Sequence, residues 1–312
     1  MRQIYTLIFY AALPFVLLRL YWRGLKVPDY RRRWRERLGW YGGEPLQQPV
    51  IWVHCVSVGE AEAAFPLIRL LKAEQPAQRF LVTTTTPTGS ARVRAAFKGQ
   101  VEHVYLPYDL PGVLERFFTH FRPQMAVFME KEIWPNLFAK CAQRQIPLFI
   151  INARLSARSA PGYKKISHLI KPALACVEHI AVQTAEDRGR FIDIGAEPEK
   201  VSVLGNLKFD LALEDGILSA GRALRQEVFA GRYVWILAST HHGEESLLLP
   251  IYQALKTQIA NLLLVIAPRH PVRFQAVKAD CEQQGFKVAM RSEGHVVGAN
   301  IDIYLADSMG EL

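Results

Sequence analysis

From residue 50 onward, short apolar runs rich in β-branched side chains alternate with longer amphipathic stretches, and this alternation constrains the fold most strongly. We expect strands at 50–56, 80–85, 101–106, 125–129, 147–152, 180–183 and 201–204. After a polar interval at 205–216, further strands are expected at 233–239, 261–268, 285–290 and 301–307. Strands that alternate with helices form parallel sheets covered on both faces. The sequence therefore predicts an α/β chain of two units joined by a short linker.

The 312 residues suit two domains of roughly 100–200 residues each. We place the first domain at residues 25–210 and the second at 211–312. An open doubly wound sheet normally has about five or six strands, whereas the second domain offers four apolar runs. We therefore expect the second domain to be truncated and the sequence to be a fragment.

The N-terminal segment is apolar. Residues 3–18 carry no charge, and extension to Trp22 adds only Arg19. About 20 apolar residues span the hydrocarbon core of a bilayer, and the dense arginines that follow indicate the cytoplasmic side. We therefore expect a membrane anchor at residues 1–24 with the domains in the cytoplasm. The segment is short and contains Pro14, so a single-pass span, an interfacial helix and a buried core helix all remain open.

Basic residues are concentrated at the N-terminus. Residues 1–37 account for +7 of the net charge of +9, so the remainder is nearly neutral and we expect no nucleic acid as a partner. The four cysteines form no C-x-x-C pair, and the sequence has no P-loop, dinucleotide-binding or nucleophile-elbow motif. It also lacks the D-x-D pair with which sugar-nucleotide transferases usually hold a divalent metal, so we expect no metal site.

Charged residues follow several expected strands, among them Glu60, Glu130 and Arg269. The carboxyl ends of parallel strands converge on one edge, where ligands bind. For Glu60, catalysis and simple stabilisation of a helix start remain equally open, and a helix N-terminus favours an ionised carboxylate. The segment STHHGEE at 239–245 lacks the H-E-x-x-H spacing. We expect its Glu244 and Glu245 to lie on a solvated helix start rather than to bind a metal.

Nine segments carry a resemblance to a known family. In order they are VHCVSVGE, TTTTPTGS, YLPYD, MEKEIWPN, NARLSARS, GNLKFD, STHHGEE, APRHPVRF and DSMGEL. Together they closely resemble the Kdo transferases of lipopolysaccharide synthesis, where Kdo is 3-deoxy-D-manno-oct-2-ulosonic acid. Members of that family have the GT-B fold, two Rossmann-like domains facing a cleft. The resemblance implies inverting, metal-independent transfer of Kdo from CMP-Kdo to a lipid A precursor at the inner membrane, without a cofactor.

The resemblance also implies roles for individual residues. Glu60 matches the catalytic base of the family, and Glu130 and Lys208 match a pair that stabilises the transition state. Matches to the CMP-binding segments are Pro268, Arg269, Met309, Gly310 and Glu311.

Other interpretations remain open. The family continues with a glycine-rich loop and an Asn-x-x-Glu segment that complete the nucleotide pocket, so we expect part of the donor site to be missing. One alternative is a non-catalytic, membrane-bound lipid-binding remnant, and another is a GT-B transferase with a different sugar donor. The number of Kdo residues added, the acyl-chain preference and the oligomeric state do not follow from these motifs.

Overall fold

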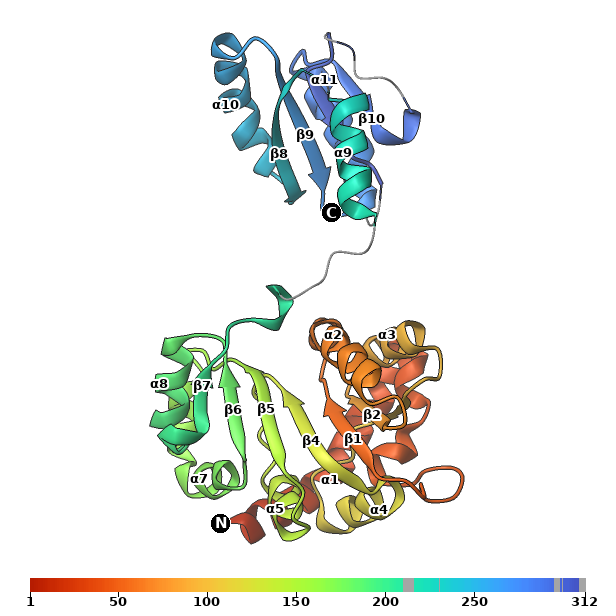
Figure 1. The fold of residues 1–312 in the computed structure, drawn as a ribbon, viewed down its shortest axis with the longest axis vertical. Helices are drawn as coiled ribbons and strands as arrows, with labels where there is room; N and C mark the ends of the chain where they lie inside the picture. Colours follow the sequence, from red (N-terminus) through yellow and green to blue (C-terminus); the bar gives the residue numbers. More distant parts are fainter. Residues whose placement is uncertain (210–215, 230, 295–297, 299, 309–312) are drawn as a thin grey trace. The chain divides into compact units, whose positions relative to one another are not determined.

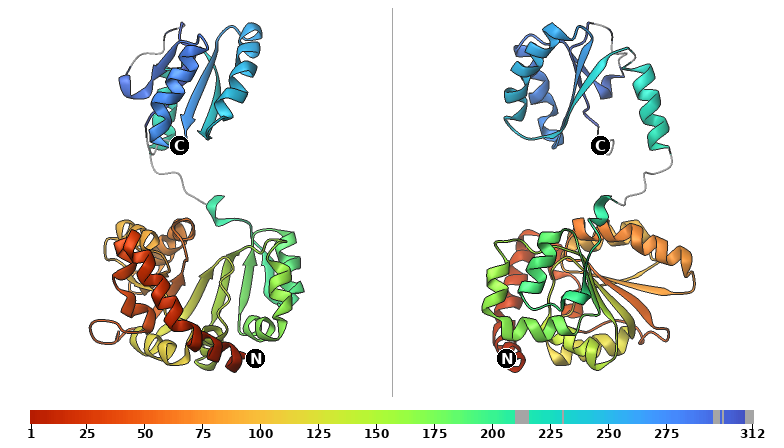
Figure 2. Two further views of the ribbon diagram at one scale, coloured as in Figure 1. Left: turned by 180° about the vertical axis from the view of Figure 1, so that it is seen from behind. Right: turned by 60° about the vertical axis from the view of Figure 1, so that its left-hand side comes forward.

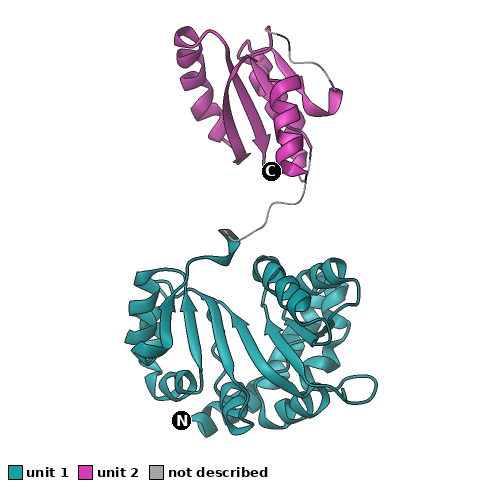
Figure 3. Ribbon diagram, in the orientation of Figure 1, with its two compact units in different colours: residues 1–212 teal, residues 213–312 magenta. Residues whose placement is uncertain are grey.

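The computed structural model describes residues 1–209, 216–229, 231–294, 298 and 300–308. The chain divides into two compact units, Met1–Ala212 and Leu213–Leu312 (Figure 3). Each unit contains a parallel sheet with helices packed against it (Figure 1). A strand is present at every one of the expected apolar runs. The predicted α/β fold class is therefore confirmed.

The sheet of unit 1 has, within the described residues, the strand order β3-β2-β1-β4-β5-β6-β7. The strands are β1 (Val50–His54), β2 (Arg79–Thr84), β3 (Glu102–Tyr105), β4 (Pro123–Met129), β5 (Leu148–Ala153), β6 (His179–Val182) and β7 (Val201–Val203). Since β1 pairs with β2 on one side and with β4 on the other, the sheet reverses its direction of growth between β1 and β4. Open α/β sheets bind ligands at such a switch point, beyond the carboxyl ends of the strands.

Helices cover both faces of this sheet because its strands are apolar on both sides. Trp52 of β1 packs on Phe117 of α4 (Pro111–Phe121), with ring centroids 4.6 Å apart. Val53 belongs to the opposite core with Phe65 of α2 (Val58–Glu74). The helices are α1 (Arg2–Lys26), α2 (Val58–Glu74), α3 (Pro87–Phe97), α4 (Pro111–Phe121), α5 (Pro135–Gln143), α6 (Ala160–Lys165), α7 (Ser167–Ala175) and α8 (Ala185–Asp193). Short 3₁₀ turns are η1 (Pro28–Arg31), η2 (Trp34–Leu38), η3 (Pro198–Lys200) and η4 (Leu207–Phe209).

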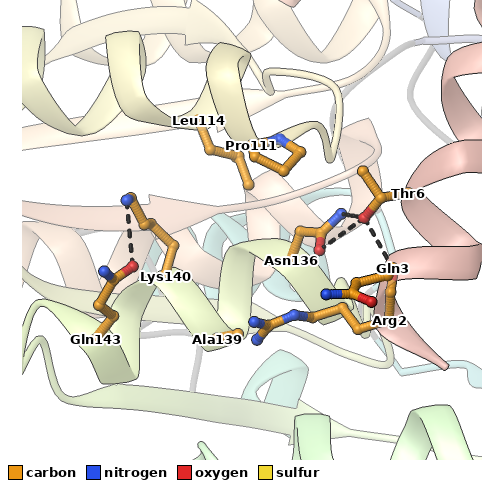
Figure 4. A pocket seen from close by; sticks show the side chains of 9 residues that line it. All are labelled: Arg2, Gln3, Thr6, Pro111, Leu114, Asn136, Ala139, Lys140 and Gln143. Carbon is orange, nitrogen blue, oxygen red and sulfur yellow. Dashed lines mark hydrogen bonds between the residues drawn. The ribbon is translucent and has the colours of Figure 1, made fainter.

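Helix α1 packs on unit 1 along one side, and the view from behind shows it running obliquely across the unit (Figure 2). Near its start, Asn136 Nδ2 of α5 donates a hydrogen bond of 2.8 Å to Thr6 Oγ1, at a cavity of about 290 Å³ between α1, α4 and α5 (Figure 4). Further along α1, the ring centroids of Phe9 and Tyr108 are 6.2 Å apart. The other side of α1 exposes large apolar side chains, among them Leu7, Phe15, Leu18 and Trp22.

By length and composition α1 could cross a membrane, and it is the one helix among the described residues of which this holds. A helix packed on the rest of its domain passes the same test, so its membrane location stays a prediction.

Unit 2 has, in its described part, the parallel strand order β10-β11-β9-β8. These strands are β8 (Tyr233–Thr240), β9 (Leu262–Pro268), β10 (Val288–Met290) and β11 (Ile303–Leu305). The helices are α9 (Ile217–Glu227), α10 (Glu244–Gln258) and α11 (Phe274–Gln283), with 3₁₀ turns η5 (Pro271–Arg273) and η6 (Arg291–Glu293). Strand β9 is buried along its whole length, and Leu264 and Ile266 lie in the main core with Tyr252 of α10.

Candidate functional site

Both predicted catalytic carboxylates lie at the switch point of unit 1. Glu60 is in the first turn of α2, which follows β1, and Glu130 directly follows β4. Because β1 and β4 are hydrogen-bonded neighbours, both carboxylates lie at the same edge of the sheet. Glu130 contributes to the electrostatic environment of Glu60, so the two side chains are close enough to interact.

Local sequence explains how Glu60 is positioned. Ser57 caps α2 by accepting a hydrogen bond from the Glu60 N–H, in the S-x-x-E pattern of a capping box. The carboxylate turns back to the chain entering the helix. Its Oε2 accepts a bond of 2.7 Å from the Val56 N–H, and its Oε1 accepts one of 3.1 Å from the Ser57 hydroxyl. Glu60 therefore has the structural role of a helix-start residue, and this role fixes where its charge lies.

The pKa of Glu60 departs from the expectation drawn from its helix position. Burial, with a smaller contribution from Glu130, raises the pKa to about 7 against the bonds from Val56 and Ser57. The position at the helix N-terminus does not keep this pKa low, because burial outweighs the hydrogen bonds that favour the charged form. A carboxylate that titrates near neutral pH is suited to accept a proton from a substrate hydroxyl.

Glu130 has an unusual backbone conformation. Its φ of +61° lies in the left-handed region, which is uncommon for glutamate, and its N–H donates to the carbonyl of Ile151 at 3.0 Å. Asn152, at the end of neighbouring β5, has a φ of +51°. Left-handed residues of this kind concentrate at functional sites, where the surrounding structure holds them in place. Two such residues at adjacent strand ends mark this edge of the sheet.

Lys208 reaches the same edge from η4. Asn152 Oδ1 accepts a hydrogen bond of 3.1 Å from the Leu207 N–H, which holds this turn beside β5. A Cβ placed on Gly59 would lie 4.0 Å from Lys208 Nζ, so the ammonium group lies against the start of α2, next to Glu60. Unit 1 thus brings Glu60, Glu130 and Lys208 together. Their catalytic roles stay predictions.

The predicted nucleotide-binding residues belong to unit 2. Pro268 ends β9, and Arg269 follows it with an exposed side chain. The Arg269 N–H donates 3.0 Å to the carbonyl of Thr240 at the end of β8, and Ser239 there has a left-handed φ of +58°. These residues lie at the carboxyl edge of their sheet. Met309, Gly310 and Glu311 lie outside the described residues.

Glu245 was missed as an organising residue of this edge, and the expectation of a solvated position was wrong. Its side chain is buried, and Arg273 Nη2 binds its two carboxylate oxygens at 2.9 and 2.8 Å. Thr240 donates a further bond of 2.6 Å to it, and Arg273 also donates to the Thr240 carbonyl at 2.8 Å. Although burial raises the pKa of Glu245, the bonds from Arg273 and Thr240 lower it on balance. The Glu245 carboxylate therefore fixes the loops that follow β8 and β9.

The adjoining histidines do not gather further ligands. His241 and His270 approach each other with ring centroids 5.8 Å apart. Within the part of the chain that the structure describes, no three His, Cys, Asp or Glu side chains form a group that could hold a metal ion.

Comparison with known proteins assigns the family. Residues 32–211 match the family model of 3-deoxy-D-manno-octulosonic-acid transferase (kdotransferase). The chain is 40% identical to the 3-deoxy-D-manno-octulosonic acid transferase of Haemophilus influenzae over 312 residues, covering all of this chain and 73% of that protein. It is 35% identical to the transferase of the same name from Bordetella pertussis, covering all of this chain and 74% of the relative.

Structural comparison agrees on the fold. The UDP-GlcNAc 2-epimerase of Neisseria meningitidis matches with a TM-score of 0.52 at 13% identity, over 84% of this chain and 72% of the epimerase. At that identity the similarity concerns the fold alone, a GT-B-like pair of parallel α/β units. The family-model match and the two transferase relatives agree: the chain belongs to the 3-deoxy-D-manno-octulosonic-acid transferase family of glycosyltransferases.

Proposed function

We propose that this chain transfers Kdo from CMP-Kdo to a lipid A precursor, with Glu60 as the general base. The observation that carries the proposal is the position of Glu60, a buried carboxylate with a pKa raised to about 7 by desolvation, at the switch point of the sheet. A sugar hydroxyl is a weak nucleophile, and a carboxylate that takes its proton contributes typically about 10²- to 10⁴-fold. Family membership supports the reaction class.

In the proposed step, Glu60 accepts the proton of the acceptor hydroxyl while the hydroxyl oxygen bonds to the anomeric carbon of Kdo. The bond from that carbon to the phosphate oxygen breaks, CMP leaves, and the configuration inverts. Positive charge develops on the sugar ring, and negative charge on the departing phosphate. Glu130 and Lys208 are proposed to stabilise these charges, which preorganised groups in a partly buried site do effectively.

The donor is proposed to bind at unit 2. Arg269 follows Pro268 at the carboxyl edge of the sheet, where an exposed guanidinium can bind a phosphate through two parallel hydrogen bonds. Met309, Gly310 and Glu311 are proposed to belong to the same CMP site. We propose that no metal or cofactor takes part, so that arginine, lysine and backbone amides neutralise the phosphate.

The membrane partner is also a proposal. The exposed apolar side of α1, together with the arginines that follow it, supports attachment to the cytoplasmic face of the inner membrane. A lipid A precursor is a membrane glycolipid, so attachment there would bring enzyme and acceptor together.

The test compares Glu60→Gln with Glu62→Gln. Glutamine at position 60 can still accept the Val56 hydrogen bond but cannot take a proton. Glu62 lies on the same helix, is exposed and pairs with Arg92, so its replacement controls for the loss of one charge. In a full-length version, with CMP-Kdo and lipid A precursor, CMP release should fall by at least about 100-fold in Glu60→Gln alone.

Near-normal turnover by folded Glu60→Gln would rule out this residue as the base. A full-length parent that binds the lipid precursor and releases no CMP would instead support the non-catalytic, lipid-binding alternative. Competition by UDP rather than CMP would indicate a different sugar donor.

A further inference from the structure

A second cavity of unit 1 has a strongly cationic lining. It measures about 240 Å³ and lies between α1 and the loops that follow β2, β3 and β4. Arg19 and Arg23 of α1 and Arg37 of η2 all line it, together with Thr85 after β2 and Trp134 after β4. Drug-sized ligands occupy pockets of about 300–1,000 Å³, so this cavity suits a smaller charged group.

The three arginines have no carboxylate partner among the described residues. Arg19 takes part in no described ion pair, and Arg23 donates to the Tyr30 hydroxyl at 2.7 Å. The acidic residues of this segment are already engaged, Asp29 by Arg32 and Glu36 by Arg33. Glu36 acts on Arg37 through space, but no carboxylate in the described part of the chain forms an ion pair with any of the three.

Arg37 gives the strongest indication that the cavity binds an anion, because only 6% of this residue is exposed. Its Nη2 donates 2.7 Å to the Thr85 carbonyl, its guanidinium lies 4.2 Å from the Tyr105 ring centroid, and its buried Nε has no hydrogen-bond partner. Buried donors are normally paired, and a buried charge is normally matched by an opposite one. Both requirements are met by an anion with several acceptor oxygens.

Hydrogen bonds connect this cavity to Glu60. The Thr85 carbonyl accepts from Arg37, while the Thr85 N–H and hydroxyl both donate to the Val56 carbonyl, at 3.3 and 3.0 Å. The Val56 N–H in turn donates to Glu60. Thr85 lines the cavity, so Val56 alone links the cavity wall to the proposed base.

The remaining wall identifies the kind of molecule that carries the anion. Val16 and Leu20 of α1 line the cavity, and the outer side of the same helix exposes Phe15, Leu18 and Trp22. A molecule with an anionic head and apolar chains matches this pairing of a cationic cavity with an apolar helix.

We propose that this cavity binds a phosphate monoester carried by a lipid, with Arg37, Arg19 and Arg23 as its ligands. We further propose that this lipid is the acceptor substrate, and that part alone rests on the proposed transferase function. A monoester presents three terminal oxygens to the arginines, whereas a phosphodiester presents two, so the cavity favours the monoester.

The test measures binding of the 312-residue chain to phosphatidylcholine vesicles that contain either phosphatidate, a monoester, or phosphatidylglycerol, a diester, at matched surface charge. The parent should prefer phosphatidate. Arg19→Gln/Arg23→Gln removes two of the three ligands and should reduce this preference by at least about tenfold, since a single charge-assisted contact is worth about that factor. Arg32→Gln/Arg35→Gln removes the same charge from residues that do not line the cavity, and it should weaken binding to both vesicles equally.

Arg37→Lys keeps the charge but loses the planar guanidinium, and it should also reduce the preference. Equal preference in the parent and both cavity variants would overturn the proposal, as would an equal loss of preference in the control. Inorganic phosphate should compete weakly. Full displacement of the chain from phosphatidate by inorganic phosphate at the same concentration would overturn the lipid as the source. Since no donor is present, the outcome does not depend on Glu60 being the catalytic base.

Discussion

Replacement of Glu60 by glutamine should stabilise unit 1 at alkaline pH and not at acid pH. The folded-state pKa of about 7 exceeds the ordinary value of 4.5 because the carboxylate is buried. Between these two values the folded state holds a proton that the unfolded state releases. The free energy of unfolding therefore falls as pH rises from 4.5 to about 7, and it stays lowered by the full amount above that range. Glutamine keeps the shape of the side chain without this titration.

The size of the effect follows from the pKa displacement. A rise from 4.5 to about 7 corresponds to at most about 3 kcal/mol. Solvent at the edge of the sheet screens part of this energy, so we expect Glu60→Gln to gain about 1–2 kcal/mol over the parent on passing from about pH 4.5 to about pH 8.

The assay is urea unfolding followed by tryptophan fluorescence, because Trp52 is fully buried in the core of unit 1. Burial lowers the pKa of His54 and of His103 to about 3, so both histidines make the folded state lose stability as pH falls below about 6.5. That loss occurs in the parent and in Glu60→Gln alike, and it cancels in their difference.

A stability difference that is the same at about pH 4.5 and about pH 8 would refute the assigned burial penalty. A variant that is less stable than the parent at the higher pH would refute it as well, and would show that the charge of Glu60 stabilises the start of α2.

Two further substitutions test the buried carboxylates that organise each unit. Asp109 accepts backbone hydrogen bonds from Asn136 and Leu137 at 3.0 and 2.7 Å, so Asp109→Ala should lower the free energy of unfolding by about 2–4 kcal/mol in urea titrations; a loss below about 0.5 kcal/mol would contradict this. Glu245→Gln should destabilise unit 2 by about 3 kcal/mol because it leaves Arg273 uncompensated, seen as faster amide exchange at 233–268. The pKa of Glu245 is lowered on balance, so its contribution to stability is present above the unfolded-state pKa and disappears as pH falls through the folded-state pKa. Unchanged amide exchange in Glu245→Gln at neutral pH would contradict the organising role of this carboxylate.

The strands could be predicted from sequence because each one is a local apolar run, and a fully buried strand such as β9 needs no distant partner to be recognised. The start of α2 was equally local, since Ser57 and Glu60 carry the capping pattern. The catalytic role assigned to Glu60 came from family resemblance and not from its spacing.

The remaining features depend on contacts between distant parts of the chain. Glu245 is buried because Arg273, 28 residues later, binds it. Arg37 belongs to a cavity because it reaches the carbonyl of Thr85, 48 residues away. The arginine-rich composition of 31–37 was visible in the sequence, but which of these arginines would lack a carboxylate was not.

Hydropathy could not distinguish a free anchor from a helix that is part of unit 1, because the Thr6 to Asn136 contact spans 130 residues. This packing has a mechanical consequence. A flexible tether would let the carboxyl edge of the sheet sample a range of heights and tilts, with an entropic cost each time it met a fixed target. A helix bonded to the domain removes that freedom. Any surface that binds α1 therefore also fixes the distance between Glu60 and that surface. The search for a substrate on the surface then becomes two-dimensional.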